Sequence, residues 1–246
     1  MPRPSATTFM SVVTPALGRG DVEVLRDEID RRWKPADLCG LLSDPDLDVR
    51  RTAVVTMGLV GDRGVIGCLT RCLHDADAQV HQFAEDALWS IWFRIGNPAA
   101  SERFRKGLKF LSDEDFVAAA AEFNQTLDLD PDFAEAYNQL AIAHYLSGEW
   151  DASISACRRV LALMPTHFGA MAGLGHGYAH RGELKQAIDC YRRALAINPQ
   201  MTAITDAKQR LEAELARDPV EGKPFGEADS YDSESFNFEF DPTDRS

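Results

Sequence analysis

The chain has 246 residues, 45% of them apolar and 26% charged, and its formal net charge is −13 at pH 7. This composition is ordinary for a folded water-soluble protein. The sequence contains no apolar run of about 18 residues and no signal-peptide pattern, which argues against a membrane protein. The acid surplus disfavours nucleic-acid binding, because phosphate contacts need Lys and Arg gathered on one face. We therefore expect a cytoplasmic protein that binds neither membrane nor nucleic acid.

The first residues of the chain lack a helical signal. Residues 1–20 combine three prolines and two glycines with small polar residues, and show no sustained hydrophobic period. They predict a loose N-terminal arm. From residue 21 onward the pattern becomes helical, because Val22, Leu25 and Ile29 share one face. Pro35 suits the first turn of a second short helix.

A short motif then occurs twice. Residues 42–46 read Leu-Ser-Asp-Pro-Asp and residues 73–77 read Leu-His-Asp-Ala-Asp, so the period of this shorter repeat is 31 positions. Aspartates in these places can cap the following helix, where exposed N–H groups and the helix dipole favour carboxylates. The apolar residues after each copy share one spacing and predict two helix faces: Val49, Ala53, Met57 and Val60, then Val80, Ala84, Leu88 and Ile91.

The pattern of residues 42–53, Leu-x-Asp-Pro-Asp-x-x-Val-Arg-Arg-x-Ala, is similar to the short HEAT repeats found in bilin lyases. The second copy is degenerate, since it has His-Gln at 81–82 where the first has Arg-Arg at 50–51. The resemblance implies a HEAT-like region over residues 21–96. A Gly-Asn-Pro sequence at its end is the expected join to the next region.

The chain contains five cysteines, and each lies within a helical pattern. Their odd number and the absence of a loop framework predict reduced thiols in the core. A zinc site at Cys68, Cys72 and His74 is not expected, because no second cysteine pair exists. The five are Cys39, Cys68, Cys72, Cys157 and Cys190.

A second and longer period covers the middle of the chain. Pro131, Pro165 and Pro199 are evenly spaced, with 34 positions from each to the next, and the chain between them aligns without gaps. Turn residues precede a large apolar residue in each copy, which indicates a break between two helices. The columns agree in kind: Gly107, Ala141 and Gly175 are small, while Phe116, Trp150 and Leu184 are large and apolar.

This pattern resembles the tetratricopeptide repeat, whose 34-residue unit is a helical hairpin closed by a proline. The resemblance implies hairpins over residues 100–133, 134–167 and 168–201. A capping helix follows up to residue 217, with Ile204, Ala207, Leu211 and Leu215 on one face. The predicted fold class is therefore all-α: a right-handed α–α superhelix of HEAT-like helices, three tetratricopeptide hairpins and a capping helix.

The resemblance implies a non-enzymatic scaffold that binds a protein or peptide segment in the concave groove of the first helices. Chaperone-binding members of the family hold a C-terminal carboxylate with Lys and Asn, and here Phe104 and Leu108 stand at the corresponding places. The carboxylate clamp is therefore missing. We expect an apolar and amide-lined groove formed by Asn138, Gln139, Ile142, Tyr145, Ala172, His176 and His180.

His176 and His180 stand one helical turn apart and could present two imidazoles to a metal. No third ligand is apparent, so peptide contact is the preferred interpretation. We expect no metal and no cofactor. The alternative function is a HEAT-repeat enzyme or a chromophore-handling protein of the bilin-lyase type. The His-Glu pairs of di-iron HEAT enzymes do not occur in this sequence.

The C-terminal segment, residues 218–246, contains nine acids against Lys223 and Arg245, a net charge of −7. It predicts a disordered acidic tail. The longer period also places two arginine pairs at equivalent positions on successive second helices. One interpretation is a solvated face with local pairs such as Asp189 to Arg193, and the other is a tail-docking patch. The patch consists of Arg158, Arg159, Arg192 and Arg193.

Overall fold

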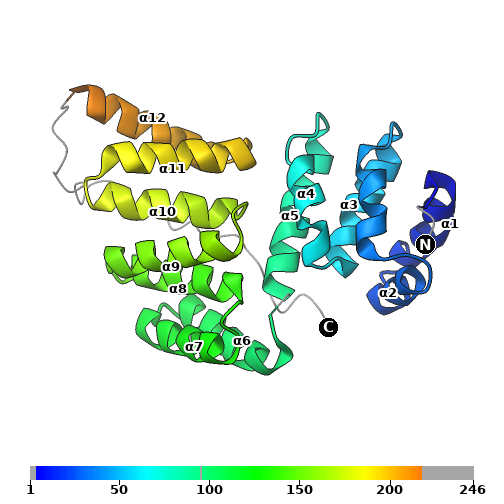
Figure 1. Cartoon of the computed structure of the whole chain (residues 1–246), viewed down its shortest axis with the longest axis horizontal. Coiled ribbons are helices and arrows are strands. Elements are labelled where there is room, and N and C mark those ends of the chain that lie inside the picture. The colour runs from blue at the N-terminus through cyan, green and yellow to red at the C-terminus, as the bar shows by residue number, and fades with distance from the viewer. Residues whose placement is uncertain (1–3, 95, 218–246) are drawn as a thin grey trace. The chain divides into compact units, whose positions relative to one another are not determined.

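The computed structural model describes residues 4–94 and 96–217, and every regular element in these ranges is helical. The predicted all-α solenoid fold is confirmed. The chain divides into two compact units, one up to Gly96 and the other from Asn97 (Figure 1). The division falls at the predicted Gly-Asn-Pro join. Within the described ranges, none of the helices combines the length and apolar composition that a bilayer crossing requires.

The first unit is built from α-helices with two short 3-10 helices. Helix α3 packs against α5, and α4 packs against α5 as well. The elements are α1 (Ala6–Leu17), α2 (Val22–Asp30), η1 (Pro35–Ser43), α3 (Leu47–Val60), η2 (Arg63–Val65), α4 (Ile66–Cys72) and α5 (Ala78–Arg94).

Helix α1 corrects the prediction of a loose arm over residues 1–20. The Ser5 hydroxyl caps this helix by accepting from the Thr8 N–H at 3.2 Å. Its buried residues, Phe9, Val13 and Ala16, are spaced four and three apart and form one apolar face. The prolines and glycines hid this face from the sequence analysis. Pro15 is tolerated because it lies in the last turn, where it removes one backbone hydrogen bond.

Two arginines of the first copy of the shorter repeat bind the two aspartates of the second. Arg50 donates from Nε and Nη2 to Asp75 at 3.1 and 3.4 Å, and Arg51 donates likewise to Asp77 at 3.1 and 2.7 Å. The hydrogen bond from Arg51 lowers the pKa of Asp77. One period further on, residues 106 and 108 are Lys and Leu. The second copy, which has His-Gln in place of the arginine pair, is thus not followed by a third pair of aspartates at this spacing.

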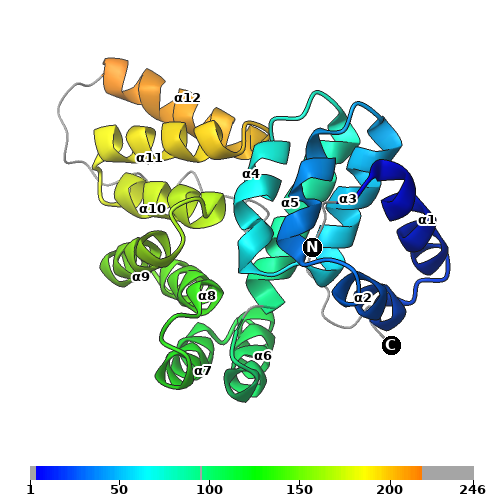
Figure 2. The ribbon, with the colours of Figure 1, turned by 45° about the vertical axis from the view of Figure 1, so that its right-hand side comes forward.

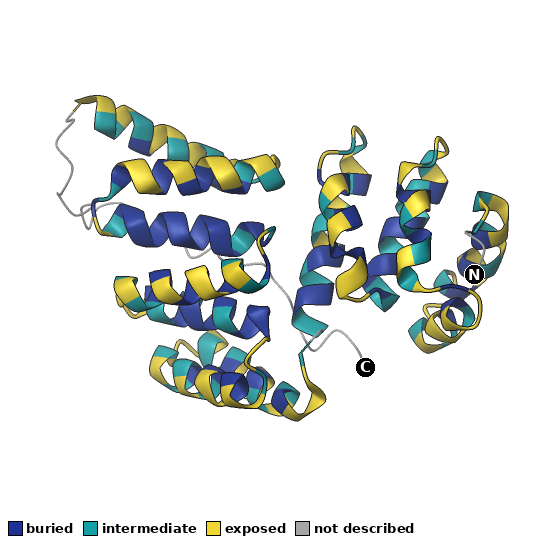
Figure 3. Ribbon diagram, in the orientation of Figure 1, coloured by how far each residue is buried: buried dark blue, intermediate teal, exposed yellow. Residues whose placement is uncertain are grey.

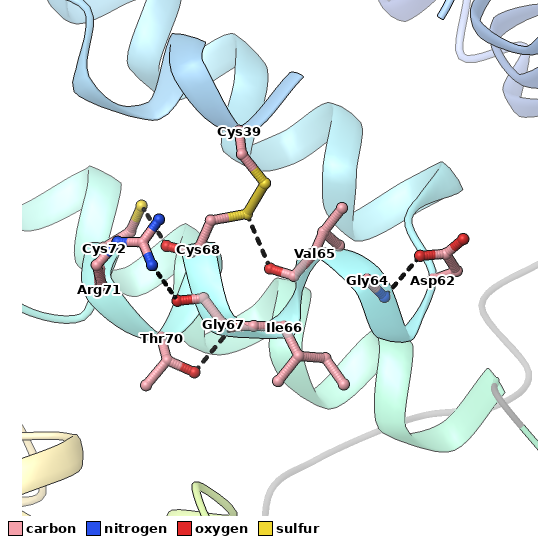
Figure 4. Close-up of a disulfide and its surroundings, with 10 residues drawn as sticks. All are labelled: Cys39, Asp62, Gly64, Val65, Ile66, Gly67, Cys68, Thr70, Arg71 and Cys72. Carbon is pink, nitrogen blue, oxygen red and sulfur yellow. Dashed lines mark hydrogen bonds between the residues drawn. A yellow bond between two sulfur atoms is a disulfide. The ribbon is translucent and has the colours of Figure 1, made fainter. Parts of the chain in front are cut away.

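Cys39 and Cys68 form a disulfide that joins η1 to α4, with their Cα atoms 5.9 Å apart (Figure 4). The prediction of five reduced thiols is wrong for these two, because periodicity along one helix does not show which cysteines two helices bring together. Cys72, Cys157 and Cys190 are free and buried. Burial raises the pKa of Cys72 to about 11 and of Cys157 to about 12, so both stay protonated at pH 7. The cytoplasmic location stays a prediction.

The second unit is a series of helical hairpins. Helices α6, α8 and α10 pair with α7, α9 and α11 respectively, and Figures 1 and 2 show α8 to α12 stacked in chain order. The bounds are α6 (Pro98–Ser112), α7 (Phe116–Leu129), α8 (Ala134–Leu146), α9 (Trp150–Leu163), α10 (Phe168–His180), α11 (Leu184–Ile197) and α12 (Thr202–Arg217).

The small column of the repeat lies where the paired helices approach most closely. A Cβ atom added to Gly107 would stand 2.5 Å from the Phe123 ring, and one added to Gly175 would stand 2.5 Å from the Tyr191 ring. Real Cβ atoms do not come so close to a ring, so these positions require glycine. The middle repeat has Ala141 and a cysteine, not an aromatic ring, at the equivalent positions. A smaller opposing side chain there accommodates the extra methyl group.

The turns inside the hairpins follow the same period. Gly148 and Gly182 both have φ 75°, in the left-handed region that glycine adopts without strain. The first hairpin has Glu114 at this place, with φ 60°. The turn geometry is thus preserved where the sequence departs from the pattern.

Helix α12 covers the end of the stack and continues the repeat. Ile204, Ala207 and Leu211 are buried against α11. Glu212 occupies the position equivalent to Tyr178 one period later, and accepts a hydrogen bond from Arg192 at 2.7 Å. Helix α12 is therefore equivalent to the first helix of a fourth hairpin. The predicted tail, residues 218–246, lies outside the described residues.

The substitution Gly175→Ala should lower the unfolding free energy by about 1–3 kcal/mol, because Tyr191 cannot move away without losing its hydrogen bond to His176. Urea unfolding followed by circular dichroism measures the change. Gly67→Ala is the control: nothing lies within 4 Å of an added Cβ there, so helix propensity should stabilise the protein by up to about 1 kcal/mol. Equal effects of both variants would contradict the close approach at Gly175.

Reduction of the Cys39–Cys68 bond should lower the unfolding free energy by about 3–4 kcal/mol, since the bond joins residues 29 apart. Urea unfolding with and without reductant measures this difference. Cys39→Ala should abolish the response to reductant, whereas Cys72→Ala should keep it. Peptide mapping without reduction should recover the two cysteines linked, and alkylation of Cys39 in the unreduced native chain would exclude the bond.

Candidate functional site

The predicted groove residues lie on α8 and α10, the first helices of the second and third hairpins. Figure 3 shows α10 buried along almost its whole length, and Gly169 and His180 are its half-buried exceptions. The two helices lie side by side, and most polar groups of the predicted groove bond to other groups of the protein. The predicted groove residues therefore divide into buried ones that hold the hairpins together and others that are half-buried.

A buried carboxylate lies at the start of α8. The Glu135 side chain is 0% exposed. Its Oε1 atom accepts from Asn138 Nδ2 at 3.0 Å and from Gln139 Nε2 at 2.7 Å, and its Oε2 atom bonds His167 Nε2 at 3.0 Å. A buried carboxylate is expensive unless donors surround it. Three side chains meet that need here.

His167 joins this carboxylate to the next hairpin. Its Nδ1 atom accepts the N–H of Ala170 at 3.1 Å and so caps α10. Because Nδ1 accepts, the ring proton is on Nε2, which donates to Glu135. The sequence analysis missed this role of His167. The spacing of Asn138 and Gln139, three and four residues after Glu135 on one helix, was the available signal.

Asn138 and Gln139 were predicted to contact a ligand, and the structure gives them another role. They are 4% and 7% exposed, and both amide groups donate to Glu135. Ala172 is also buried, on α10. These three residues form the interior behind the groove. Helical spacing predicted that they lie on first helices but did not show that a buried carboxylate would engage the amides.

An aromatic cluster connects α8, α9 and α10. The Trp150 ring stacks on the His180 ring with centroids 4.2 Å apart and planes 12° apart. Tyr145 meets Trp150 edge-on at 5.1 Å, and its hydroxyl bonds His180 Nε2 at 2.8 Å. Trp150 and His180 are half-buried. This cluster presents flat rings in a fixed arrangement, which suits contact with apolar or aromatic groups.

His176 lies one turn before His180 but points to a different partner. Its Nδ1 atom bonds the Tyr191 hydroxyl at 2.7 Å, and the side chain is 1% exposed. Burial, assisted by the charges of His180 and Arg210, lowers the pKa of His176 to about 3. Burial also lowers the pKa of His180. Both rings are therefore neutral at pH 7.

The structure brings Tyr145, His176 and His180 together, with the Tyr145 ring centroid 6.0 Å from that of His176 and 5.2 Å from that of His180. The described residues contain no group of three or more His, Cys, Asp or Glu side chains arranged to hold a metal ion. An apolar strip adjoins the aromatic cluster along α8. Ile142 is half-buried and Leu146 is exposed, and they stand four residues apart on one helix face.

The buried neutral imidazole makes stability depend on pH. The pKa of His176 is about 3 in the folded chain and 6.5 in the unfolded chain. Its neutral ring therefore contributes fully to the unfolding free energy above pH 6.5, and this contribution declines as pH falls towards 3. The unfolding free energy should fall by about 1.4 kcal/mol per pH unit per such histidine. His176→Gln should remove that part of the slope, measured by urea unfolding between pH 6.5 and 5. An unchanged slope would show that His176 is protonated in the folded state.

Comparison with known proteins finds matches to the longer repeat. Residues 132–200 match the family model for the tetratricopeptide repeat. A TPR repeat-containing protein of Rhizobium etli is 29% identical over 99 residues, covering 40% of this chain and 48% of that protein. The chain thus spans about half the length of this curated relative. These matches indicate no catalytic family.

Two solved structures are among those to which this chain is similar. The first TPR domain of Spaghetti (RPAP3), bound to the HSP90 peptide SRMEEVD, is 21% identical with a TM-score of 0.47, covering 48% of this chain and 93% of that one. The Sgt2 TPR domain from Aspergillus fumigatus is 15% identical with a TM-score of 0.47, covering 56% and 95%. The family-model match over residues 132–200 lies within the stretch where the longer sequence period predicts tetratricopeptide hairpins.

Proposed function

We propose that the second unit is a non-enzymatic interaction scaffold that binds a protein or peptide segment on the face formed by α6, α8 and α10. The observation that carries this proposal is the tetratricopeptide match over residues 132–200. Units of this kind present the first helices of successive hairpins to a ligand. The chemistry of the exposed and half-buried groups on these helices then decides what is bound.

The reachable part of this face is apolar and aromatic. Ile142 and Leu146 form a strip on α8, and the stacked pair of Trp150 and His180 adjoins the end of that helix. Both histidines of α10 are neutral at pH 7, so the face offers no positive charge from them. A segment with an apolar or aromatic anchor fits this chemistry, because large flat side chains contribute most to such interfaces.

Recognition of a free C-terminal carboxylate is not part of this proposal. Phe104 stands at one place where chaperone-binding members hold that group. It is buried, with its ring 5.8 Å from Phe123 and 4.7 Å from Phe133. This residue belongs to the core of the first hairpin. The proposed ligand is therefore an internal segment or a helix.

The buried bonds behind the face support binding by keeping it rigid. Glu135 and His167 fix the start of α10 relative to α8, and Tyr145 fixes His180. Interface side chains that are already held lose less conformational entropy when a ligand binds. The face is thus prepared before the ligand arrives.

The alternative, a chromophore-handling protein, has one observation in its favour. The first unit contains a cleft of about 460 Å³, within the size range of small-molecule sites, with Cys72, Arg71 and His74 among its lining residues. Arg50 and Asp75 also line it, but they pair with each other. Visible absorbance of the protein purified from its host would favour this second function.

The scaffold proposal is tested with paired variants of the full chain used as bait in a host lysate. Ile142→Asp with Leu146→Asp places two charges on the proposed face. The control, Val117→Asp with Leu129→Asp, charges two exposed apolar residues of α7 that are 78% and 49% exposed. A genuine partner should be recovered about tenfold less by the first variant and normally by the control.

Circular dichroism must show equal helicity for both variants. Quantitative mass spectrometry then compares their captured proteins with those of the unaltered chain. Recovery of the same partners by all three baits would show that they do not bind on this face, and the first-unit cleft would become the preferred site.

A further inference from the structure

A surface of arginines and tyrosines lies on α8 to α11, separate from the proposed ligand face. Arg158 of α9 donates from Nη2 to the Tyr178 hydroxyl at 2.6 Å, and its guanidinium lies 5.8 Å from the centre of the Tyr178 ring. Arg159 reaches the other way, 5.6 Å from the centre of the Tyr137 ring. The two arginines of α9 are thus held over tyrosines of both neighbouring first helices.

Arg193 of α11 adds a third positive charge to this surface. It is exposed and follows Cys190 by three residues on α11, and the charges of Arg193 and Arg158 both act to lower the pKa of the Cys190 thiol. Asp189 is the acid nearby that acts on the same thiol. The local pair predicted between Asp189 and Arg193 is not among the ion pairs of the described residues.

Comparison of equivalent positions in the repeat shows which of these arginines pair with a carboxylate. Arg192 occupies the position equivalent to Arg158 one period later. Each arginine contacts the residue 20 positions further along the chain. For Arg158 that residue is Tyr178, whereas for Arg192 it is the carboxylate of Glu212. Arg192 is thereby neutralised. Arg158, Arg159 and Arg193 are exposed and form no salt bridge with a carboxylate of residues 4–94 or 96–217. We define these three, with Tyr137 and Tyr178, as the arginine–tyrosine surface.

The chain carries a segment of matching chemistry. Residues 218–246 have a net charge of −7, and the rest of the chain has −13 − (−7) = −6. Phe236, Phe238 and Phe240 alternate with polar and acidic residues there, and in an extended strand such residues point to one side. A guanidinium that rests on a tyrosine with one face can receive a phenylalanine ring on its exposed face.

The tether makes the contact easy to reach. Helix α12 packs on α11 and ends at Arg217. The stretch from there to Phe236 spans up to about 60 Å when extended, whereas α11, with 14 residues, is about 21 Å long. A short tether raises the local concentration of the segment to about the millimolar range. Weak individual ion pairs then suffice for binding within one chain.

We propose that residues 218–246 bind in cis to the arginine–tyrosine surface, with their acids on Arg158, Arg159 and Arg193 and their phenylalanines on the guanidinium planes. Attraction by a surplus of positive charge selects this surface within a body that is otherwise acidic. Any acidic partner of this surface must then displace the chain's own C-terminal segment. The proposal is independent of the proposed ligand face, because it uses other residues and a different kind of attraction.

Hydrogen–deuterium exchange of the full chain tests the proposal. At low salt, amides of residues 230–241 should exchange about tenfold more slowly in the unaltered chain than in Arg159→Gln with Arg193→Gln, as for a segment bound about nine-tenths of the time. This variant leaves the bond from Arg158 to Tyr178 in place. The difference should vanish near 1 M salt, where the screening length is about 3 Å.

The matched control is Arg105→Gln with Lys106→Gln, which removes two exposed charges from α6 of the same unit and should leave the slow exchange unchanged. A second variant, Phe236→Ser with Phe238→Ser and Phe240→Ser, should abolish it without altering peptides from α9 and α11. Equal exchange in the unaltered chain and the arginine variant overturns the proposal. Slowing that appears only as protein concentration rises overturns it too, because the segment then binds a second copy.

Discussion

The close approach of paired helices is the constraint on which the second unit depends. In the first and third hairpins a glycine lies against an aromatic ring so tightly that a single added carbon would stand 2.5 Å from it. The middle hairpin reaches the same arrangement with Ala141 and Cys157, a larger residue on one side and a smaller one on the other. Because each hairpin closes in the same way, equivalent residues recur at one fixed period along the stack. All the contacts between repeats follow from that regularity.

In both units, hydrogen bonds and ion pairs join corresponding positions of successive repeats. In the first unit, adjacent arginines of one copy bind two aspartates of the next. In the second, an arginine at one position reaches forward by 20 residues in two successive repeats. Such ties hold neighbouring helices in one register, which apolar packing alone specifies less strictly. A fixed register is what a repeat array needs if several helices are to form one binding surface.

Burial determines which polar side chains of α8 and α10 bond within the protein. A carboxylate in the interior must be surrounded by donors, so the amides beside Glu135 face inward. The groups left for the proposed ligand are the apolar strip of α8 and the ring pair of Trp150 and His180. The proposed ligand face is therefore less polar than its residue types indicate. Stability and the proposed recognition depend on the same helices, and the buried hydrogen bonds determine which of their side chains stay available to a ligand.

The sequence by itself determined the helical fold and the two repeat lengths, because these follow from local spacing and from sterically required small residues. It missed α1, where prolines and glycines masked a spacing of four and three between buried residues. Only the tertiary structure decided which side chains meet. The bond between Cys39 and Cys68, the link from His167 to Glu135 and the pairing of Arg158 with Tyr178 each join residues 20 or more positions apart. Their partners depend on how whole helices pack, and the period of a single helix contains no information about its neighbour's rotation.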